Sequence, residues 1–362
     1  MLRRRRVGFV SDAEGNFDWF MAYVGCSKVL RKVGQRLELQ DDDCHFVYGG
    51  DALDHGPGEQ RLVGALVELK ERYPDRVSLL LGNRDINKMR LTSELAEVGK
   101  RPPAEIPGPY WQKKEYRVDL STFLKNREAS QPKYSPLDFV PAKWKGGVDT
   151  KAARLQWILR HTMGAPRSYH FRREEMALLQ GVAVGSIEPE EVVASYEASI
   201  AAGGWLRRYL ELGQLGVVID SSLFVHGAIS PSSIGVVPGA AARIEDPTQW
   251  IKALNDWKQR EYVEWLRHPE WNRERTYRGG EALLDYGVPG GAGGASVVYA
   301  TWQKPLKTPA PVPDAVLSYL TQGGIRRVFG GHQRARIWRA GGQSRSRLWH
   351  HCSMLLRPSP TP

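Results

Sequence analysis

Short apolar runs alternate with longer helix-spaced patterns over the first hundred residues. Val7–Val10, Cys44–Tyr48 and Val77–Leu81 have the length of buried strands, and polar or glycine residues follow each one directly. Between them, Phe17–Leu30 and Leu62–Tyr73 place apolar residues at helical spacing, and Pro74 ends the second pattern. This β-α-β-α-β order predicts a mixed α/β (α+β) core that is either doubly wound or built of two sheets.

The pattern changes over residues 101–212, where prolines cluster and strand-like runs are absent. Apolar residues recur there at helical spacing over Lys151–Met163, Arg173–Gln180 and Pro189–Leu212. We therefore expect a largely helical insertion or cap between two halves of a core, which occupy residues 1–100 and 213–362.

Strand patterns return in the last third of the chain. They cover Gly216–Asp220, Leu223–Val225, Val297–Ala300 and Arg326–Phe329, and a further helix is predicted over Pro313–Gln322. A Trp-rich helical segment near 246–268 begins at Asp246, because Asp is a good N-cap and Pro247 suits the first helical position. The apolar face of this helix carries Trp250, Leu254, Trp257 and Trp265.

Composition narrows the class of protein. The 362 residues carry a formal net charge of +11, and Arg3–Arg6 supplies four of these charges, either as a solvated tail or as a nucleic-acid contact. The charge favours an anionic ligand. No apolar run approaches the ~20 residues that span a bilayer, and the segment before Val7 is too short for a signal peptide. The three cysteines form no CxxC motif, so we expect an intracellular, cytoplasmic protein without a membrane partner.

Six polar residues that follow apolar runs form the candidate chemistry: Asp12, Glu14, Asp51, Asn83, His226 and His332. Each has an ordinary explanation by itself, since a lone Asp after a strand is usually a turn or a cap. In α/β sheets, however, the carboxyl ends of strands are where ligands bind. Carboxylate, amide and imidazole groups together suit divalent metal ions, so the six residues predict a metal site.

The motifs that contain these residues resemble those of the calcineurin-like metallophosphoesterase superfamily. They are DxE at Asp12–Glu14, GDxxD at Gly50–Asp54, GNRD at Gly82–Asp85, VHG at Val225–Gly227 and GGH at Gly330–His332. The resemblance covers residues 7–100 and about 216–335, and it points to a divergent member of the protein-phosphatase-like or diadenosine-tetraphosphatase-like branch. It implies a β-sandwich of two sheets flanked by helices.

The resemblance also implies a two-metal site. Asp12 and Glu14 would hold one ion, and Asn83, His226 and His332 the other, with Asp51 bridging the two. A water or hydroxide between the ions would attack phosphorus in line. Glu14 stands where the family usually has a histidine, and the extra carboxylate favours Mn²⁺ or Mg²⁺ over zinc. We expect Mn²⁺, with Mg²⁺, Fe and Zn as alternatives.

Two further departures concern the residues that would handle the phosphate. Arg334 falls where many members have a second histidine, and Arg84 replaces the histidine that usually protonates the leaving group. Arginine stays protonated and cannot be that acid, but it can hold phosphate. His55 could then be the acid, with Asp54 pairing with Arg84 or orienting His55. Alternatively, no strong acid exists and the leaving group has a low pKa.

The remaining candidates complete the expected site. Asp85 of GNRD joins Arg84, His55 and Asp54 as a candidate catalytic residue. Arg172 and Arg173, close to His161 and His170, form either a substrate-binding edge or a polar cap surface, and Arg334 is a further substrate-binding candidate.

Two functions of different classes fit these patterns. The first is a metal-dependent phosphoesterase acting on a phosphorylated small molecule, a nucleotide or a dinucleotide, with a phosphoprotein as a further candidate and nucleic acid disfavoured. The second is a catalytically silent protein that binds a partner or nucleic acid through its basic surface. The substitutions at the family's usual histidine positions motivate this second reading.

Overall fold

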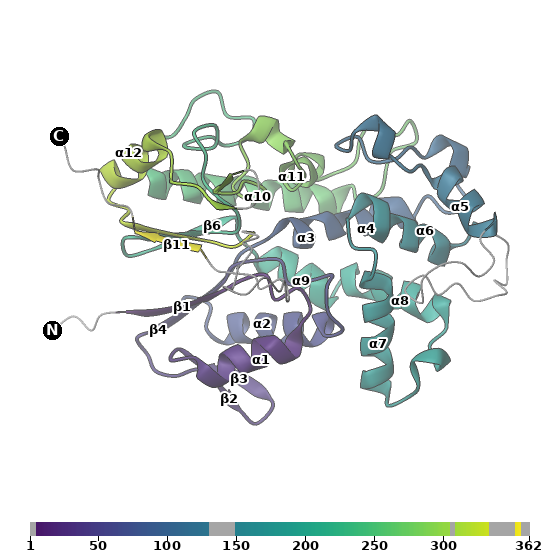
Figure 1. The fold of residues 1–362 in the computed structure, drawn as a ribbon, viewed down its shortest axis with the longest axis horizontal. Helices are drawn as coiled ribbons and strands as arrows, with labels where there is room; N and C mark the ends of the chain where they lie inside the picture. Colours follow the sequence, from purple (N-terminus) through teal and green to yellow (C-terminus); the bar gives the residue numbers. More distant parts are fainter. Residues whose placement is uncertain (1–4, 130–148, 305–307, 333–351, 356–362) are drawn as a thin grey trace, which may run out of the picture.

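The computed structural model describes residues 5–129, 149–304, 308–332 and 352–355, and Figure 1 shows their arrangement. Two sheets form the centre of the molecule. The first has the order β1-β4-β5 and is parallel, and the second has the order β11-β10-β7-β6. Their strands are β1 (Arg6–Val10), β4 (Cys44–Tyr48), β5 (Val77–Leu79), β6 (Gly216–Ile219), β7 (Ser222–Val225), β10 (Arg327–Gly330) and β11 (Cys352–Leu355).

The register brings the ends of the central strands to common edges. Val10 pairs with Tyr48 at the ends of β1 and β4, so the chain leaves both strands at the same edge. In the second sheet β7 and β10 are parallel, and Val225 pairs with Gly330 at their ends. Polar residues that follow these strands in sequence are therefore neighbours in space.

Aromatic side chains pack between the two sheets. Phe224 of β7 stacks on Phe329 of β10 with ring centroids 4.6 Å apart, and Phe9 of β1 lies 5.7 Å from Phe224. Val47 and Leu80 belong to the same apolar cluster. The chain between residues 79 and 81 also hydrogen-bonds to Gln214, which joins the sheets at one side. The fold is thus a two-sheet α+β sandwich, as the sequence predicted.

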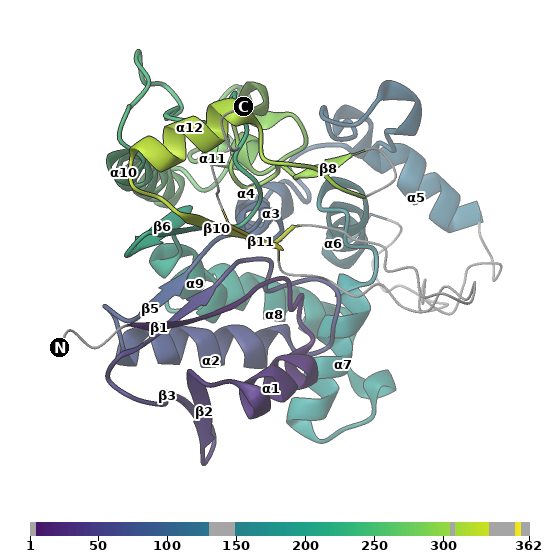
Figure 2. The same cartoon turned by 60° about the vertical axis from the view of Figure 1, so that its left-hand side comes forward.

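Helices cover the outer faces of the sandwich (Figure 2). Helices α1 (Phe17–Cys26) and α2 (Glu59–Arg72) lie along the first sheet, and α10 (Pro247–Arg267) and α12 (Asp314–Gln322) lie along the second. As predicted, the Asp246 carboxylate caps α10 by accepting a hydrogen bond from Gln249 N, and the four predicted apolar residues of α10 are buried. The shorter helices are α3 (Asn83–Ile86), α4 (Arg90–Leu95) and α11 (Glu281–Tyr286).

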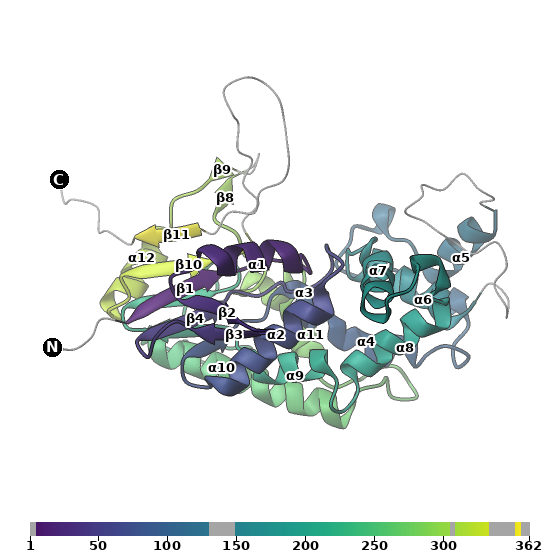
Figure 3. The ribbon, with the colours of Figure 1, turned by 90° about the horizontal axis from the view of Figure 1, so that it is seen from below.

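The described part of segment 101–212 is largely helical; its first four helices gather at one end of the molecule, whereas the last, α9 (Trp205–Leu212), lies beside α2 (Figure 3). The first four are α5 (Leu120–Ala129), α6 (Lys151–Trp157), α7 (Ser168–Gln180) and α8 (Pro189–Ile200). The single helix expected over Pro189–Leu212 is two helices, because the chain turns at residues 201–204, where Gly203 has a φ of 79°. The division into three parts stays a prediction.

Three short elements differ from the sequence expectation. Leu30 begins β2 (Leu30–Val33), which forms a hairpin with β3 (Arg36–Leu39), and so it does not extend α1. The expected strand Val297–Ala300 is instead a turn with Val297 and Val298 buried, and the Val297 carbonyl accepts a hydrogen bond from Gly227 N at 2.8 Å. The strand β11 was not predicted, and two-residue strands β8 (Gln303–Lys304) and β9 (Thr308–Pro309) form another small hairpin. Among the described helices, none has both the length and the apolar character needed to cross a membrane.

Candidate metal centre

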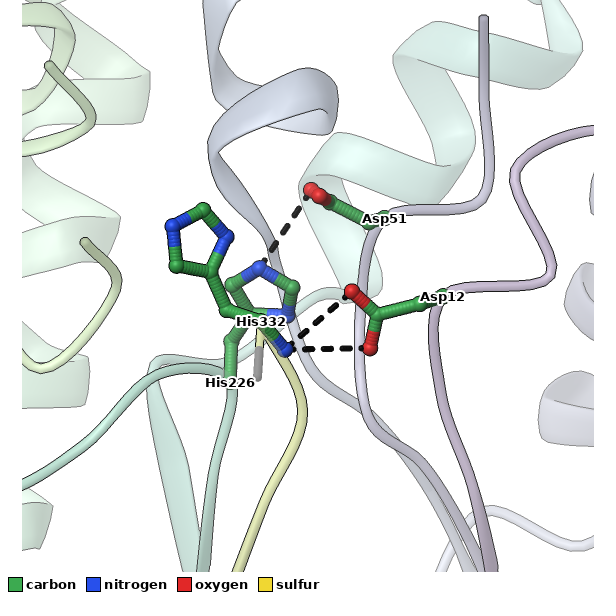
Figure 4. A group of neighbouring side chains, drawn as sticks. All are labelled: Asp12, Asp51, His226 and His332. Carbon is green, nitrogen blue, oxygen red and sulfur yellow. Dashed lines mark hydrogen bonds and ion pairs between the residues drawn. The ribbon is translucent and has the colours of Figure 1, made fainter. Parts of the chain in front are cut away.

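Four of the predicted ligands meet at the edge where the strands end. Asp12, Asp51, His226 and His332 follow β1, β4, β7 and β10, and one potential ligand atom from each lies within 4.8 Å of the others. Figure 4 shows the two carboxylates on one side of the group and the two imidazoles on the other. Residues 320 positions apart thus share one small polar space, with His332 N donating to the Asp12 carboxylate at 3.1 Å.

The backbone at these residues has an unusual conformation. Asp12, Asp51 and His332 each have a φ of 54°, Glu14 has a φ of 49° and Asp54 has a φ of 94°. Non-glycine residues rarely adopt this left-handed region, and such strain concentrates at functional sites. Hydrogen bonds between the loops hold it in place, since Asp12 N donates to Gly50 O and Glu14 N donates to Asp51 O.

Glycines permit the close approach of the loops. A Cβ at Gly82 would clash with the Asp51 carboxylate, and a Cβ at Gly331 would clash with the Asp12 carboxylate. The glycines of the GNRD and GGH motifs are therefore required by the packing of the ligand side chains.

Two of the predicted ligands have a buried polar atom with unused hydrogen-bonding capacity. Among the described residues, Asn83 Oδ1 and His226 Nε2 are buried and make no hydrogen bond. The other ring nitrogen of His226, Nδ1, bonds to Gly49 O at 2.8 Å, which fixes the ring and directs Nε2 toward Asp51. Unsatisfied buried atoms are rare in proteins, so the free His226 Nε2 beside the carboxylates fits a cation held by the group of four. A ligand role for Asn83 stays a prediction.

The pKa shifts of Asp12 and His226 also indicate that the group of four favours a positive charge. Burial raises the pKa of Asp12 to about 6, against the opposing effect of His226. Burial lowers the pKa of His226, but the Asp51 carboxylate outweighs it and raises the value to about 10. In the absence of an ion, a proton on His226 would therefore supply the positive charge beside Asp51, and metal binding would release it.

Glu14 lies outside the group of four. Its Oε1 atom is 2.7 Å from Arg84 Nε and 3.8 Å from His55 Nε2. The carboxylate expected to hold a metal ion thus forms a buried ion pair with Arg84, and a role for Glu14 as a ligand stays a prediction. His55 itself is exposed.

Arg84 is surrounded by carboxylates. Its side chain is 6 % exposed, with Nε 3.6 Å from Asp51 Oδ2 and one terminal nitrogen 3.5 Å from Asp54 Oδ2. Of the two alternatives for Asp54, the structure shows the contact with Arg84.

Sequence reasoning missed the strongest partners of Asp54. Lys88 donates a 2.8 Å hydrogen bond to Asp54 Oδ2, and Ser168 of α7 donates a 2.9 Å bond to Oδ1. Both side chains are buried. Lys88 comes four residues after Arg84 on a helical segment, so the two side chains lie on the same face. This spacing was the one feature of the sequence that could have predicted Lys88 beside Asp54.

Asp85 has a supporting position in the loops. Its carboxylate accepts hydrogen bonds from the backbone nitrogens of Asp51, Ala52 and Gly82 at 2.8–2.9 Å. It is fully buried and holds the GDxxD and GNRD loops together. The expectation that Asp85 is catalytic is therefore corrected to a positioning role.

The two arginines of α7 that were expected to bind substrate make hydrogen bonds within the protein instead. Arg172 is 1 % exposed and donates to Glu59 Oε1 at 2.6 Å, while its guanidinium lies over the Tyr196 ring. Arg173 donates to Ile187 O at 2.8 Å. Their guanidinium groups are thus committed to the packing of α7, which contradicts a substrate-binding edge there. Arg334 lies outside the described residues.

Comparisons with known proteins find only distant similarity. No family model matches the chain, and no curated protein matches its sequence. Solved structures that align with this chain include the cold-active protein-tyrosine phosphatase of the psychrophile Shewanella sp., with a TM-score of 0.41 and 12% identity over 90% of this chain. A 1.1 Å structure of a cold-active protein tyrosine phosphatase gives a TM-score of 0.43 and 12% identity over 93% of this chain.

This chain aligns with 64% of the first of those structures and with 68% of the second. Both structures are of cold-active protein-tyrosine phosphatases, but similarity at this level assigns no family. The resemblance to calcineurin-like metallophosphoesterases therefore continues to rest on the sequence motifs.

Proposed function

We propose that this chain is a metal-dependent phosphoesterase that hydrolyses a phosphomonoester or a phosphoanhydride. The observation that carries the proposal is the convergence of Asp12, Asp51, His226 and His332 from four strand ends, with potential ligand atoms within 4.8 Å of one another. The strained backbone of three of these residues supports a functional origin for the cluster.

The same four side chains would hold a divalent cation, and Asn83, whose buried Oδ1 makes no hydrogen bond, is a further candidate ligand. Two carboxylates and two imidazoles suit Mn²⁺, and Mg²⁺, Fe and Zn are alternatives. When bound, such a cation supplies Lewis-acid stabilisation of phosphoryl oxygens and lowers the pKa of a nucleophilic water.

Arg84 would contribute a permanent positive charge on the chain itself. Its guanidinium lies against Asp51, next to the proposed cation, and stays protonated at any working pH. It would therefore stabilise negative charge on the phosphoryl group without transferring a proton. His55, exposed and close to Glu14, is the candidate acid for the leaving group.

The substrate class follows from charge. The chain has a formal net charge of +11, which favours anionic substrates. A phosphorylated small molecule, a nucleotide or a dinucleotide is our preferred substrate, and a phosphopeptide is the alternative. A panel containing each of these with a common Mn²⁺ concentration would rank them.

Hydrolysis of p-nitrophenyl phosphate with Mn²⁺ tests the proposal. We expect activity in the parent chain and its loss in Asp51→Asn, because that substitution removes a carboxylate shared by the whole site. Asp220→Asn is a matched control, since Asp220 has a similar φ of 52° but forms an exposed ion pair with Arg5. Full activity in Asp51→Asn, or none in the parent chain at any metal concentration, would overturn the proposal. Metal binding without hydrolysis would instead favour a silent binding protein.

A further inference from the structure

The position of Arg84 bears on how many metal ions the site can hold. The sequence resemblance implies two ions bridged by Asp51. In the structure the two oxygens of Asp51 face different cations: Oδ1 lies 3.4 Å from His226 Nε2, and Oδ2 lies 3.6 Å from Arg84 Nε. Asp51 thus bridges an imidazole and a guanidinium.

The neighbouring carboxylates also form two sets, one beside the imidazoles and the other beside Arg84. Asp12 lies with the two imidazoles in the group of four, whereas Glu14 lies 2.7 Å from Arg84 Nε and is not part of that group. Asp54 Oδ2, 3.5 Å from Arg84, completes the surroundings of the guanidinium. The carboxylate expected to provide the second ligand of one ion is therefore in contact with Arg84 instead.

From these contacts we infer that the Arg84 guanidinium takes the place of the second metal ion, so that the chain binds one divalent cation. The inference rests on the proposed metal-dependent function, because it assumes that the group of four binds an ion. A guanidinium cannot lose its proton under working conditions, so its charge is permanent. A second divalent ion beside it would meet electrostatic repulsion and would have to displace it from Glu14.

The metal content of purified variants tests this inference. Each chain is equilibrated with Mn²⁺, freed of loosely bound ions by gel filtration and measured by elemental analysis and electron paramagnetic resonance. We expect one ion in the parent chain, with the signal of isolated Mn²⁺. We expect two ions in Arg84→Gln, with the signal of a coupled pair, because Glu14 and Asp51 then have no competing cation. Arg84→Lys is the matched control, and its retained charge should keep the content at one.

Glu14→Gln provides a second test that does not remove the buried arginine. We expect this variant to keep one ion, because Glu14 is not among the four ligands. Loss of the ion in Glu14→Gln, two ions in the parent chain, or one ion in a folded Arg84→Gln would each overturn the inference. Two ions in the parent chain would leave the proposed hydrolytic function intact. No ion in any variant would overturn the inference and the proposed function together.

Discussion

At the scale of single residues, Asp54 connects the candidate centre to buried residues in the interior of the protein. Its carboxylate is buried and is held by Lys88, Ser168 and Arg84. Burial raises its pKa, but the charges of Lys88 and Arg84 outweigh burial and hold it below the ordinary value. Asp54 therefore stays ionised and links the Arg84 guanidinium to the interior of the protein.

Replacing Lys88 by methionine should destabilise the fold. The change leaves Asp54 buried without its main charged partner, and breaking a buried pair in this way costs roughly 3–5 kcal/mol of unfolding free energy. Urea denaturation measures the effect. The double variant Lys88→Met with Asp54→Asn should recover part of the loss, because it removes the unpaired charge. Lys252→Met, which changes an exposed lysine, is the control. If Lys88→Met lowers the free energy of unfolding no more than this control does, the Lys88–Asp54 pair does not stabilise the fold.

His55 can be tested as the acid through the choice of leaving group. Its exposed ring lies 3.8 Å from Glu14, which in turn contacts Arg84, the proposed phosphate-binding residue. If His55 protonates the leaving group, His55→Gln should lower kcat roughly 10²-fold on an alkyl phosphate and remove the alkaline limb of the pH profile. Hydrolysis of p-nitrophenyl phosphate should change little, because p-nitrophenolate needs no proton to leave. Equal effects on both substrates would contradict an acid role for His55.

At the scale of elements, the sequence predicted the ends of the central strands but not the contacts beyond them. Asp12, Asp51, His226 and His332 were found because each follows an apolar run, and parallel strands bring such ends together. The burial of Arg172 could not be found in this way, since its partner Glu59 lies 113 positions away on α2. The pairing of Glu14 with Arg84 was missed for the same reason. Sequence patterns place residues on strands and helices, but they do not show which of several nearby charged groups a side chain contacts.

Helices α9 and α10 are joined by a buried lysine. Lys258 of α10 donates to the Leu210 and Glu211 carbonyls at the end of α9, where the helix dipole favours a positive charge. Burial nevertheless lowers the pKa of Lys258 to about 7. Between pH 7 and the unfolded value near 10.5, the unfolded chain holds a proton that the folded chain lacks. Stability should therefore rise with pH across this window, by at most about 1.4 kcal/mol per pH unit.

Lys258→Met should remove that rise. Denaturant midpoints at pH 7 and pH 9 measure it, with Lys252→Met as the control, because Lys252 lies on the same helix but is exposed and paired with Asp256. The control should keep the pH dependence of the parent chain. If Lys258→Met also keeps this pH dependence of stability, Lys258 is not the group that causes it.

At the scale of the whole molecule, the proposed centre joins the two sheets. Asp12 and Asp51 follow strands of the first sheet, and His226 and His332 follow strands of the second, so one ion would bind both halves of the sandwich. The helical segment 101–212 adds to this connection through Ser168, whose hydroxyl reaches Asp54. We infer that metal binding and folding are coupled in this protein.

Removal of the metal should therefore lower the stability of the whole chain. An ion present at 100 times its Kd stabilises the folded state by about 2.7 kcal/mol. We expect EDTA to lower the Tm of the parent chain by several degrees and to leave the Tm of Asp51→Asn nearly unchanged. Differential scanning fluorimetry with and without Mn²⁺ measures the difference. A parent Tm that is insensitive to both reagents would argue against the coupling.

The most direct test of the central claim is an anomalous-scattering measurement on crystals grown with Mn²⁺. We predict one strong peak at the manganese edge, about 2.0–2.3 Å from ligand atoms of Asp12, Asp51, His226 and His332, with the Arg84 guanidinium still against Glu14. The absence of a peak between these four residues, with Mn²⁺ bound elsewhere or not at all, would contradict the account.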